Sequence, residues 1–148
     1  MRTKADNYVS VEFPSRSANE GFARTVAACF AAQLDPTLEE INDIKTAVSE
    51  AVTNAIVHAY PDRIGKVSMK LRLYEDSSVE IVVRDWGVGI SDVEQARQPM
   101  YTTGGEERAG MGFTIMESFM DKLRLRSVPG KGTTVTMRRR ISRRASGT

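Results

Sequence analysis

The chain has few of the residues that would cross-link it covalently or hold it in a membrane. Cys29 is its one cysteine in 148 residues, so an internal disulfide cannot form. No apolar run approaches the roughly 20 residues that span a bilayer, and the N-terminus lacks the apolar core of a secretory signal. We therefore expect a cytoplasmic protein without membrane contact, folded as one domain around its own core.

Acidic side chains are missing from the C-terminal segment 138–148, which carries five arginines. Residues 1–137 hold 16 basic and 19 acidic side chains, a net charge of −3, although the whole chain is +2. On charge grounds we expect no direct DNA binding by the body of the protein. We expect residues 142–148 to be a basic, disordered tail that either contacts an acidic partner or nucleic acid, or is simply solvated.

Hydrophobic periodicity divides the first half of the chain into one strand and two helices. Apolar residues alternate with polar ones over 9–13, as in a half-buried strand. A capping box at 17–20 predicts a helix whose apolar stripe includes Cys29 as a small core residue; the stripe is Phe22, Val26, Cys29, Phe30 and Leu34. A second capping box, at 37–40, opens the helix that carries residues 50–54.

Alternation returns in the second half. Residues 67–73 and 79–83 predict an antiparallel hairpin, and 123–137 predict another after a helix that begins near Phe113. Residues 91–109 show no convincing period, which in a compact domain is typical of a functional lid or of disorder. The blocks predict an α+β fold: a two-layer α/β sandwich with a mixed, mostly antiparallel sheet, in a single domain 1–141.

Two polar residues stand one turn apart on the second predicted helix. Glu50 and Asn54 are spaced i and i+4, so they would project from the same helical face. The Asn54 amide offers a neutral oxygen to Mg²⁺, which prefers oxygen ligands and keeps several waters beside nucleotide phosphates. Glu50 would then accept the proton of an attacking hydroxyl. The alternative is that both side chains lie on an ordinary exposed face.

An acid and two glycines follow the predicted strand at 79–83. Asp85 would place a carboxylate at the end of the strand, where it can accept a hydrogen bond from an exocyclic amine such as that of adenine. Gly87 and Gly89 would let the backbone approach a ligand closely. The alternative is a tight turn capped by Asp85.

A second glycine pair, Gly110 and Gly112 around Met111, directly precedes the third predicted helix. A glycine turn that opens a helix presents free N–H groups to an anion, and Arg108 would add a charge-assisted contact unless it is a solvated loop residue. The pattern is neither a Walker A loop nor a dinucleotide-binding fingerprint.

The order of these motifs carries a family resemblance. Asn54, Asp85-x-Gly87-x-Gly89, Gly110-x-Gly112 and Gly132-Thr133 resemble the ATP-binding superfamily of DNA gyrase B, Hsp90, histidine kinases and MutL, whose Bergerat fold is an α/β sandwich. Within it, residues 49–60, 96–103 and 110–121 are similar to the sporulation anti-sigma-F family. These proteins are serine kinases that bind sigma factor F and phosphorylate an anti-anti-sigma factor.

This resemblance implies a role for each matched residue. Glu50 would be the catalytic base and Asn54 the Mg²⁺ ligand, while Asp85 would meet the adenine amine with support from Thr133. Residues 91–109 would form a lid over ATP or ADP.

Three further roles come from the same resemblance. Arg108 would contact the γ-phosphate, and Thr103, in the lid, would contact the nucleotide. Arg24 would lie at a surface shared by both protein partners. A homodimer is also implied.

Two other interpretations stay open beside the serine kinase. One is the kinase that antagonises the general stress sigma factor, which shares the ATP motifs of this chain. Residues 97–121 favour the sporulation branch over it. A module that binds ATP without transferring phosphate is the other alternative. A histidine kinase is disfavoured because the one histidine, His58, lies in the nucleotide-binding helix.

Overall fold

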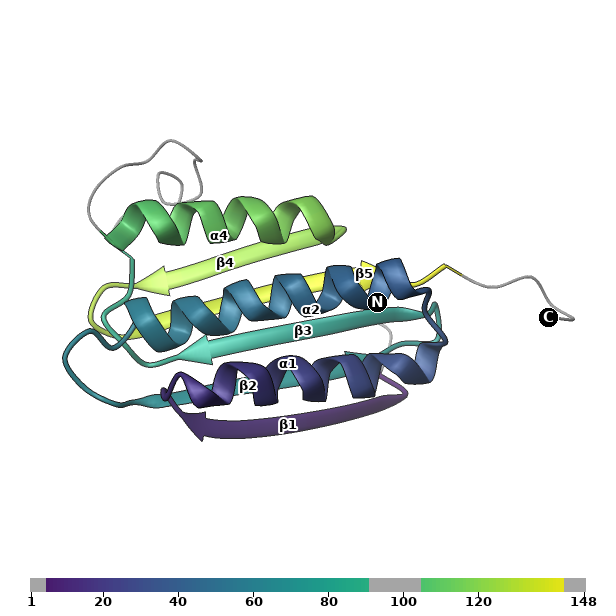
Figure 1. Ribbon diagram of the computed structural model, residues 1–148, viewed down its shortest axis with the longest axis horizontal. Helices are drawn as coiled ribbons and strands as arrows, with labels where there is room; N and C mark the ends of the chain where they lie inside the picture. Colours follow the sequence, from purple (N-terminus) through teal and green to yellow (C-terminus); the bar gives the residue numbers. More distant parts are fainter. Residues whose placement is uncertain (1–4, 91–104, 143–148) are drawn as a thin grey trace, which may run out of the picture.

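The computed structural model describes residues 5–90 and 105–142, with residues 105–110 described in their backbone only. The elements of these ranges are drawn in Figure 1. The first block is β1 (Asn7–Pro14), α1 (Ala18–Ala31), the 3-10 turn η1 (Ala32–Leu34), α2 (Leu38–Thr53) and the π-helical turn η2 (Asn54–His58). The second block is β2 (Lys66–Leu73), β3 (Ser78–Asp85), α4 (Gly105–Phe119), β4 (Lys122–Val128) and β5 (Gly132–Arg140).

The five strands form one sheet in the order β1-β2-β3-β5-β4. Both predicted hairpins, β2–β3 and β4–β5, are confirmed, as is the two-layer α+β class. The sheet was expected to be mixed, but every pairing between the described strands is antiparallel. Since β3 and β5 are neighbours, Asp85 at the end of β3 lies opposite Thr133 at the start of β5.

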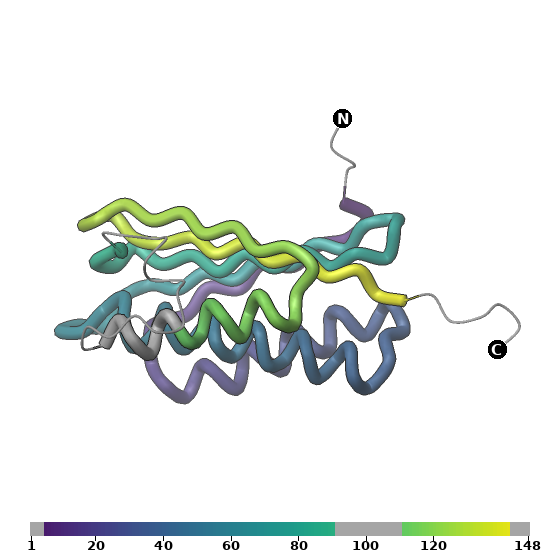
Figure 2. The backbone as a smooth tube through the Cα atoms, turned by 90° about the horizontal axis from the view of Figure 1, so that it is seen from above, coloured from purple at the N-terminus to yellow at the C-terminus, as the bar shows by residue number. Residues whose placement is uncertain are grey.

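The helices cover one face of the sheet and leave the other face open (Figure 2). α2 lies between α1 and α4 and packs against both. The core fills the space between the two layers; its largest fully buried side chains include Ile44, Met69, Leu71, Ile81, Phe113 and Met116. No helix within the described ranges is long and apolar enough to cross a bilayer.

The buried stripe of α1 differs from the predicted one. Alanines at i, i+4 and i+8, namely Ala23, Ala27 and Ala31, are fully buried, whereas Phe22 is 54% exposed and Cys29 is exposed. The prediction that Cys29 is a core residue was therefore wrong. Small alanine side chains allow the helix backbone to lie close to the sheet, and the larger apolar residues beside them are left at the rim.

The predicted capping box at the start of α2 is confirmed. The hydroxyl of Thr37 accepts a hydrogen bond from Glu40 N at 3.1 Å, and Thr37 N donates to Glu40 Oε1 at 2.9 Å. These two bonds satisfy donors that the first turn of a helix otherwise leaves unpaired. The box fixes the start of the helix that carries Glu50 and Asn54.

The capping box predicted at the start of α1 is absent, although the helix does begin at Ala18. Ser17 already has helical torsions, φ −58° and ψ −32°, and its side chain makes no capping bond. Glu20 instead accepts a hydrogen bond from Ser49 of α2 and lies 3.7 Å from Arg24. A bond between two helices has taken the place of the local cap.

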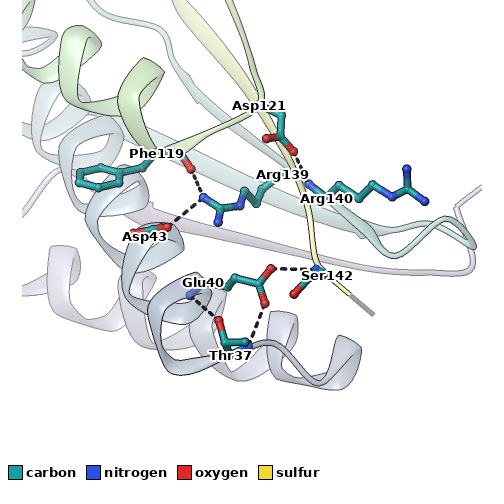
Figure 3. A network of polar contacts seen from close by, with 8 residues as sticks. All are labelled: Thr37, Glu40, Asp43, Phe119, Asp121, Arg139, Arg140 and Ser142. Atoms are coloured by element: carbon teal, nitrogen blue, oxygen red, sulfur yellow. Dashed lines mark hydrogen bonds and ion pairs between the residues drawn. The ribbon is translucent and has the colours of Figure 1, made fainter. Parts of the chain in front are cut away.

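The end of β5 is tied to the far end of α2 by polar contacts (Figure 3). Ser142 N donates to Glu40 Oε2 at 2.8 Å, and Arg139 pairs with Asp43 at 3.0 Å. Burial acts to raise the pKa of Glu40, but the hydrogen bonds from Thr37 and Ser142 outweigh it and hold that pKa below its ordinary value. This end of the molecule is a closed structural network. The disordered tail was predicted to begin at residue 142, but Ser142 is held in this network by its bond to Glu40. The rest of the predicted tail, residues 143–148, lies outside the described residues.

Candidate functional site

The helix that carries the candidate site changes geometry at Asn54. α2 ends at Thr53, and the following turn η2 is π-helical, with Ala59 N donating to Asn54 O at 3.2 Å across five residues. Such wide turns are rare and frequently occur at functional sites. The change of pitch begins at Asn54, one turn after Glu50.

Glu50 and Asn54 lie together against the backbone of α4. A Cβ added at Gly112 would stand 3.0 Å from Glu50 Oε2 and 3.1 Å from Asn54 Nδ2, so a larger residue would require these side chains to move by a few tenths of an ångström. Asn54 Nδ2 is buried and has no hydrogen-bond partner among the described residues. A buried amide donor without an acceptor is costly, which indicates that this position is built to meet a ligand oxygen.

Asp85 is a buried carboxylate at the end of β3, 6% exposed. Its Oδ1 accepts hydrogen bonds from Gly87 N at 3.0 Å and from Thr133 N at 3.1 Å, and the described residues provide no donor for Oδ2. Burial raises the pKa of Asp85, and the two backbone bonds offset that rise only in part. One oxygen thus fixes the carboxylate while the other is left to accept a bond from a ligand amine.

Three chain segments meet around Asp85. Val88 N donates to Ala59 O at 2.9 Å, which joins the turn after β3 to the end of η2. Gly130 N donates to Val88 O at 2.7 Å, which joins the same turn to the β4–β5 connection. The glycines at 87 and 89 lie at these two crossings, where an added Cβ would stand 2.1 Å and 2.3 Å from a carbonyl oxygen.

Gly132 is required by both its conformation and its surroundings. Its φ is +121°, and a Cβ there would lie 2.2 Å from the carbonyl oxygen of Asp85. The residue after it, Thr133, gives its N–H to Asp85 and its hydroxyl lies 2.8 Å from Ser127 Oγ. Sequence and fold therefore agree in bringing Gly132-Thr133 to Asp85.

Tyr60 and Ser127 hold this region together, and neither was singled out from the sequence. The Tyr60 hydroxyl donates to Lys66 O at 2.6 Å and accepts from Trp86 N at 2.7 Å. Ser127 Oγ accepts from Ile90 N at 2.7 Å. No local pattern marks either residue, and each has one partner far away in the chain: Trp86 for Tyr60 and Ile90 for Ser127.

One expectation about the second glycine pair was wrong. α4 begins at Gly105, so residues 110–112 lie inside the helix and do not open it. Residues 105–109, predicted as lid, form the first part of that helix. A glycine costs a helix only about 1 kcal/mol, which the neighbouring helix-forming residues offset. Met111 is 52% exposed on this helix, and Gly112 faces α2.

Some predicted site residues fall where nothing is described. Thr103 and the lid from 91 to 104 lie outside the described residues, and so do the side chains of Arg108 and its neighbours up to Gly110. Arg24 is placed: it lies on α1 and lines a groove between α1 and α2. The other residues that line this groove are Asn42, Lys45, Thr46, Ser49 and Glu50.

Comparison with known proteins places the chain in a family. Residues 13–139 match the histidine kinase-like ATPase domain. The chain is 58% identical to the anti-sigma F factor of Caldanaerobacter subterraneus over 93% of its own length and 96% of that protein's. It is 54% identical to the anti-sigma F factor of Geobacillus kaustophilus, over 93% and 94%.

Solved structures resemble the fold at lower identity. The crystal structure of the RsbU and RsbW domains of a Mycobacterium tuberculosis protein superposes with a TM-score of 0.68 at 22% identity, over 94% of this chain and 33% of that one. A blue-light activated histidine kinase of Erythrobacter litoralis gives a TM-score of 0.58 at 21% identity, over 79% and 40%.

Proposed function

The chain belongs to the anti-sigma F factor family of histidine kinase-like ATPase domains, and on that premise we propose that it is a Mg²⁺- and ATP-dependent serine protein kinase. Its proposed partners are sigma factor F, which it binds and inhibits, and an anti-anti-sigma factor, which it phosphorylates. The observation that carries this proposal is the face shared by Glu50 and Asn54, closed by Gly112, with a buried amide donor that finds no acceptor in the described part of the chain.

The adenine end of ATP would bind at Asp85. Its Oδ1 is held by Gly87 N and Thr133 N, so Oδ2 has a fixed direction in which to accept a bond from the exocyclic amine. A buried acceptor without a partner also discriminates, because a base that lacks the amine would leave it unpaired.

The metal would enter with the nucleotide. Within the described ranges no group of three carboxylate, histidine or cysteine side chains could hold an ion. One amide oxygen, from Asn54, nevertheless fits Mg²⁺, which takes one or two protein ligands and completes its shell with phosphate oxygens and water. Bound there, Mg²⁺ would neutralise charge on the phosphates. The NH₂ group of Asn54 would meanwhile find a phosphate oxygen as its missing acceptor.

Glu50 would receive the proton of the substrate serine. It is half-buried, one helical turn before Asn54, and it also lines the groove between α1 and α2. The carboxylate therefore faces both the proposed phosphate site and the surface. A serine hydroxyl from a partner that docks on this groove would approach Glu50 from the Arg24 side, which supports Arg24 as a partner-binding residue.

The decisive experiment compares Glu50→Gln with Glu39→Gln, a matched loss of charge at the exposed first turn of the same helix. Each protein is incubated with Mg-ATP and the anti-anti-sigma factor, and phosphoserine is measured. Glu50→Gln should transfer phosphate about 10²- to 10⁴-fold more slowly, as expected for loss of a general base, while binding ATP within about threefold of wild type. Glu39→Gln should behave as wild type.

Equal transfer by wild type and Glu50→Gln would remove the catalytic role of Glu50. If neither protein transferred phosphate although both bound ATP, the module that uses ATP only as a conformational ligand would be correct. Capture of sigma factors in the presence of ATP or ADP distinguishes sigma factor F from the general stress sigma factor. The homodimer stays a prediction, which sedimentation would test.

A further inference from the structure

The open face of the sheet is strongly basic, although the chain as a whole is nearly neutral. Alternate residues of each strand point away from the helices, and the strand register aligns them in three rows across the sheet. We call this surface the open face; its rows are Lys122-Arg138-Glu80-Arg72-Tyr8, Arg124-Thr136-Val82-Lys70-Ser10 and Arg126-Thr134-Arg84-Ser68-Glu12. Seven of these residues are lysine or arginine and only two are acidic.

Most of these cations have no carboxylate to neutralise them. Arg72 pairs with Glu80 at 2.9 Å, and Arg138 lies 3.5 Å from Asp76. The remaining five form no ion pair with any described residue: Lys70, Arg84, Lys122, Arg124 and Arg126. An open groove runs over the first two rows between β2 and β4, and its lining includes four of the seven cations. A surface of this kind attracts anions.

Protection of the sheet edge explains only part of the pattern. Charged side chains on an edge strand prevent unwanted pairing with other strands, and β4, which carries three of the cations, is such an edge. The other four cations stand on β2, β3 and β5, which are paired on both sides and have no edge to protect.

The composition of the open face selects the kind of anion. Protein interfaces have an apolar, aromatic centre with few lysines, and surfaces that insert into a membrane carry apolar side chains. Here Val82 is the one aliphatic side chain in the three rows, and Tyr8 the one aromatic. Serine and threonine hydroxyls stand between the cations at Ser10, Ser68, Thr134 and Thr136. Arginine, lysine and hydroxyl side chains are the groups that proteins use to contact nucleic-acid phosphates.

Duplex fits better than single-stranded nucleic acid. Binding of single strands relies on aromatic rings on which bases stack. Trp86, beside this face, already has two cations over its ring, Lys66 at 4.3 Å and Arg84 at 4.6 Å from the centroid, which a stacking base would have to displace or share. Cations two residues apart on β4 are about 6.7 Å apart, roughly twice the 3.4 Å axial spacing of phosphates along one strand of DNA.

We propose that the open face of the sheet is a binding site for the phosphate backbone of double-stranded nucleic acid, without sequence preference. The sequence predicted no direct DNA binding because it averaged the charge of the whole body. The fold separates those charges: the cations collect on the open face of the sheet, whereas Glu20, Glu39, Asp43 and Glu50 are on the helix layer. This site is distinct from the proposed kinase site on the other side of the sheet.

The test uses the full chain and a fluorescently labelled 24-base-pair DNA duplex, with binding measured by anisotropy at about 50 mM salt. Wild type should bind with a dissociation constant in the micromolar range or weaker, and the affinity should fall steeply with salt. Arg124→Glu/Arg126→Glu should reduce the affinity at least tenfold. The control, Arg16→Glu/Arg63→Glu, makes the same change in net charge at exposed loop positions and should change it less than about threefold.

Three results would overturn the proposal: no binding by wild type at low salt, equal losses in both double variants, or loss of binding on Arg143→Ser/Arg144→Ser alone. Competition by polyglutamate as effective as unlabelled duplex would also overturn it, in favour of an acidic protein. Thermal melting and ATP affinity are measured for every variant. Both should match wild type, so failure of duplex binding is distinguishable from failure of the kinase proposal.

Discussion

Two buried carboxylates, Glu40 near the start of α2 and Asp85 at the end of β3, differ in how their oxygens are hydrogen-bonded. Glu40, 6% exposed, has donors on both oxygens: Thr37 N on one and Ser142 N on the other. Asp85 has the same exposed fraction but lies deeper in the protein, and its two donors share Oδ1. Correspondingly, hydrogen bonding outweighs burial and lowers the pKa of Glu40, whereas burial dominates and raises the pKa of Asp85.

The difference shows that some buried polar groups of this fold serve stability and others serve ligand binding. A buried carboxylate whose lone pairs are saturated stabilises the fold, and Glu40 ties α2 to the end of β5 in this way. A buried carboxylate that is only half satisfied costs stability until a ligand completes it. Asp85 is of this second kind, and the buried NH₂ of Asn54, which has no partner among the residues described, is in the same position; both belong to the proposed nucleotide site.

The largest effect should come from Asp85→Asn. Its amide oxygen retains the bonds from Gly87 and Thr133, but an NH₂ group replaces the free oxygen and opposes the adenine amine. We expect ATP affinity to fall about 100-fold by calorimetry. Thermal stability should be unchanged or higher, because a buried charge has been removed. A variant that melts earlier and binds ATP normally would assign Asp85 to structure.

Glu40→Gln should give the opposite result. The amide NH₂ would face a backbone N–H from Thr37 or Ser142, so one of the two bonds is lost. The free energy of unfolding should fall by about 1–3 kcal/mol, while ATP affinity stays within about twofold of wild type. Denaturant unfolding and calorimetry on the same preparation measure both quantities. Unchanged stability would show that the closed network contributes nothing.

A smaller effect on binding is expected from Gly112→Ala. The added methyl group would press on Glu50 and Asn54, so Mg-ATP affinity should fall about tenfold. Gly21→Ala is the matched control on α1, where the nearest atom would be the end of Arg24 at 3.7 Å and only a gain in helix stability is expected. If both variants bound Mg-ATP as wild type does, the close contact of Gly112 with Glu50 and Asn54 would not contribute to nucleotide binding.

The smallest expected effect is on the loss of stability at acidic pH. The pKa of Glu40 is lowered from 4.5, so its stabilising contribution is present above that pH and is lost as the pH falls through the folded-state value. The pKa of Asp85 is raised, so ionisation of Asp85 opposes folding above pH 3.8 and this cost disappears in acid. Unfolding between pH 5 and pH 3 should therefore be less acid-sensitive in Glu40→Gln and more acid-sensitive in Asp85→Asn than in wild type. The reverse order would contradict the assignments.

Local signals predicted local structure well. The capping box at Thr37 needs only residues three positions apart, and the hairpins follow from alternation and turns. The box at Ser17 failed because its acid, Glu20, is engaged by Ser49, which lies 29 residues away. Cys29 was misplaced because periodicity identifies an apolar stripe but does not show that three alanines one position away are the residues that pack.

The candidate site was predictable to the extent that motifs marked it. Glu50, Asn54, Asp85 and Thr133 came from motif order and family resemblance, and the fold brings the first two together and the last two together. The contact of Gly112 with Glu50 and Asn54 links segments about sixty residues apart, which spacing alone does not encode. The basic open face could not be predicted either, because the net charge of the chain does not show which side chains the strand register places on one face of the sheet.

The most direct measurement of the central claim is a calorimetric titration of ATP into wild type and Asn54→Ala, each with Mg²⁺ and with EDTA in its place. If the end of α2 presents an oxygen to a phosphate-bound ion, Mg²⁺ should strengthen ATP binding to wild type at least about tenfold, and to Asn54→Ala less than about twofold. The EDTA affinities should be similar, since Asp85 is untouched. The same Mg²⁺ dependence in both proteins would contradict the account.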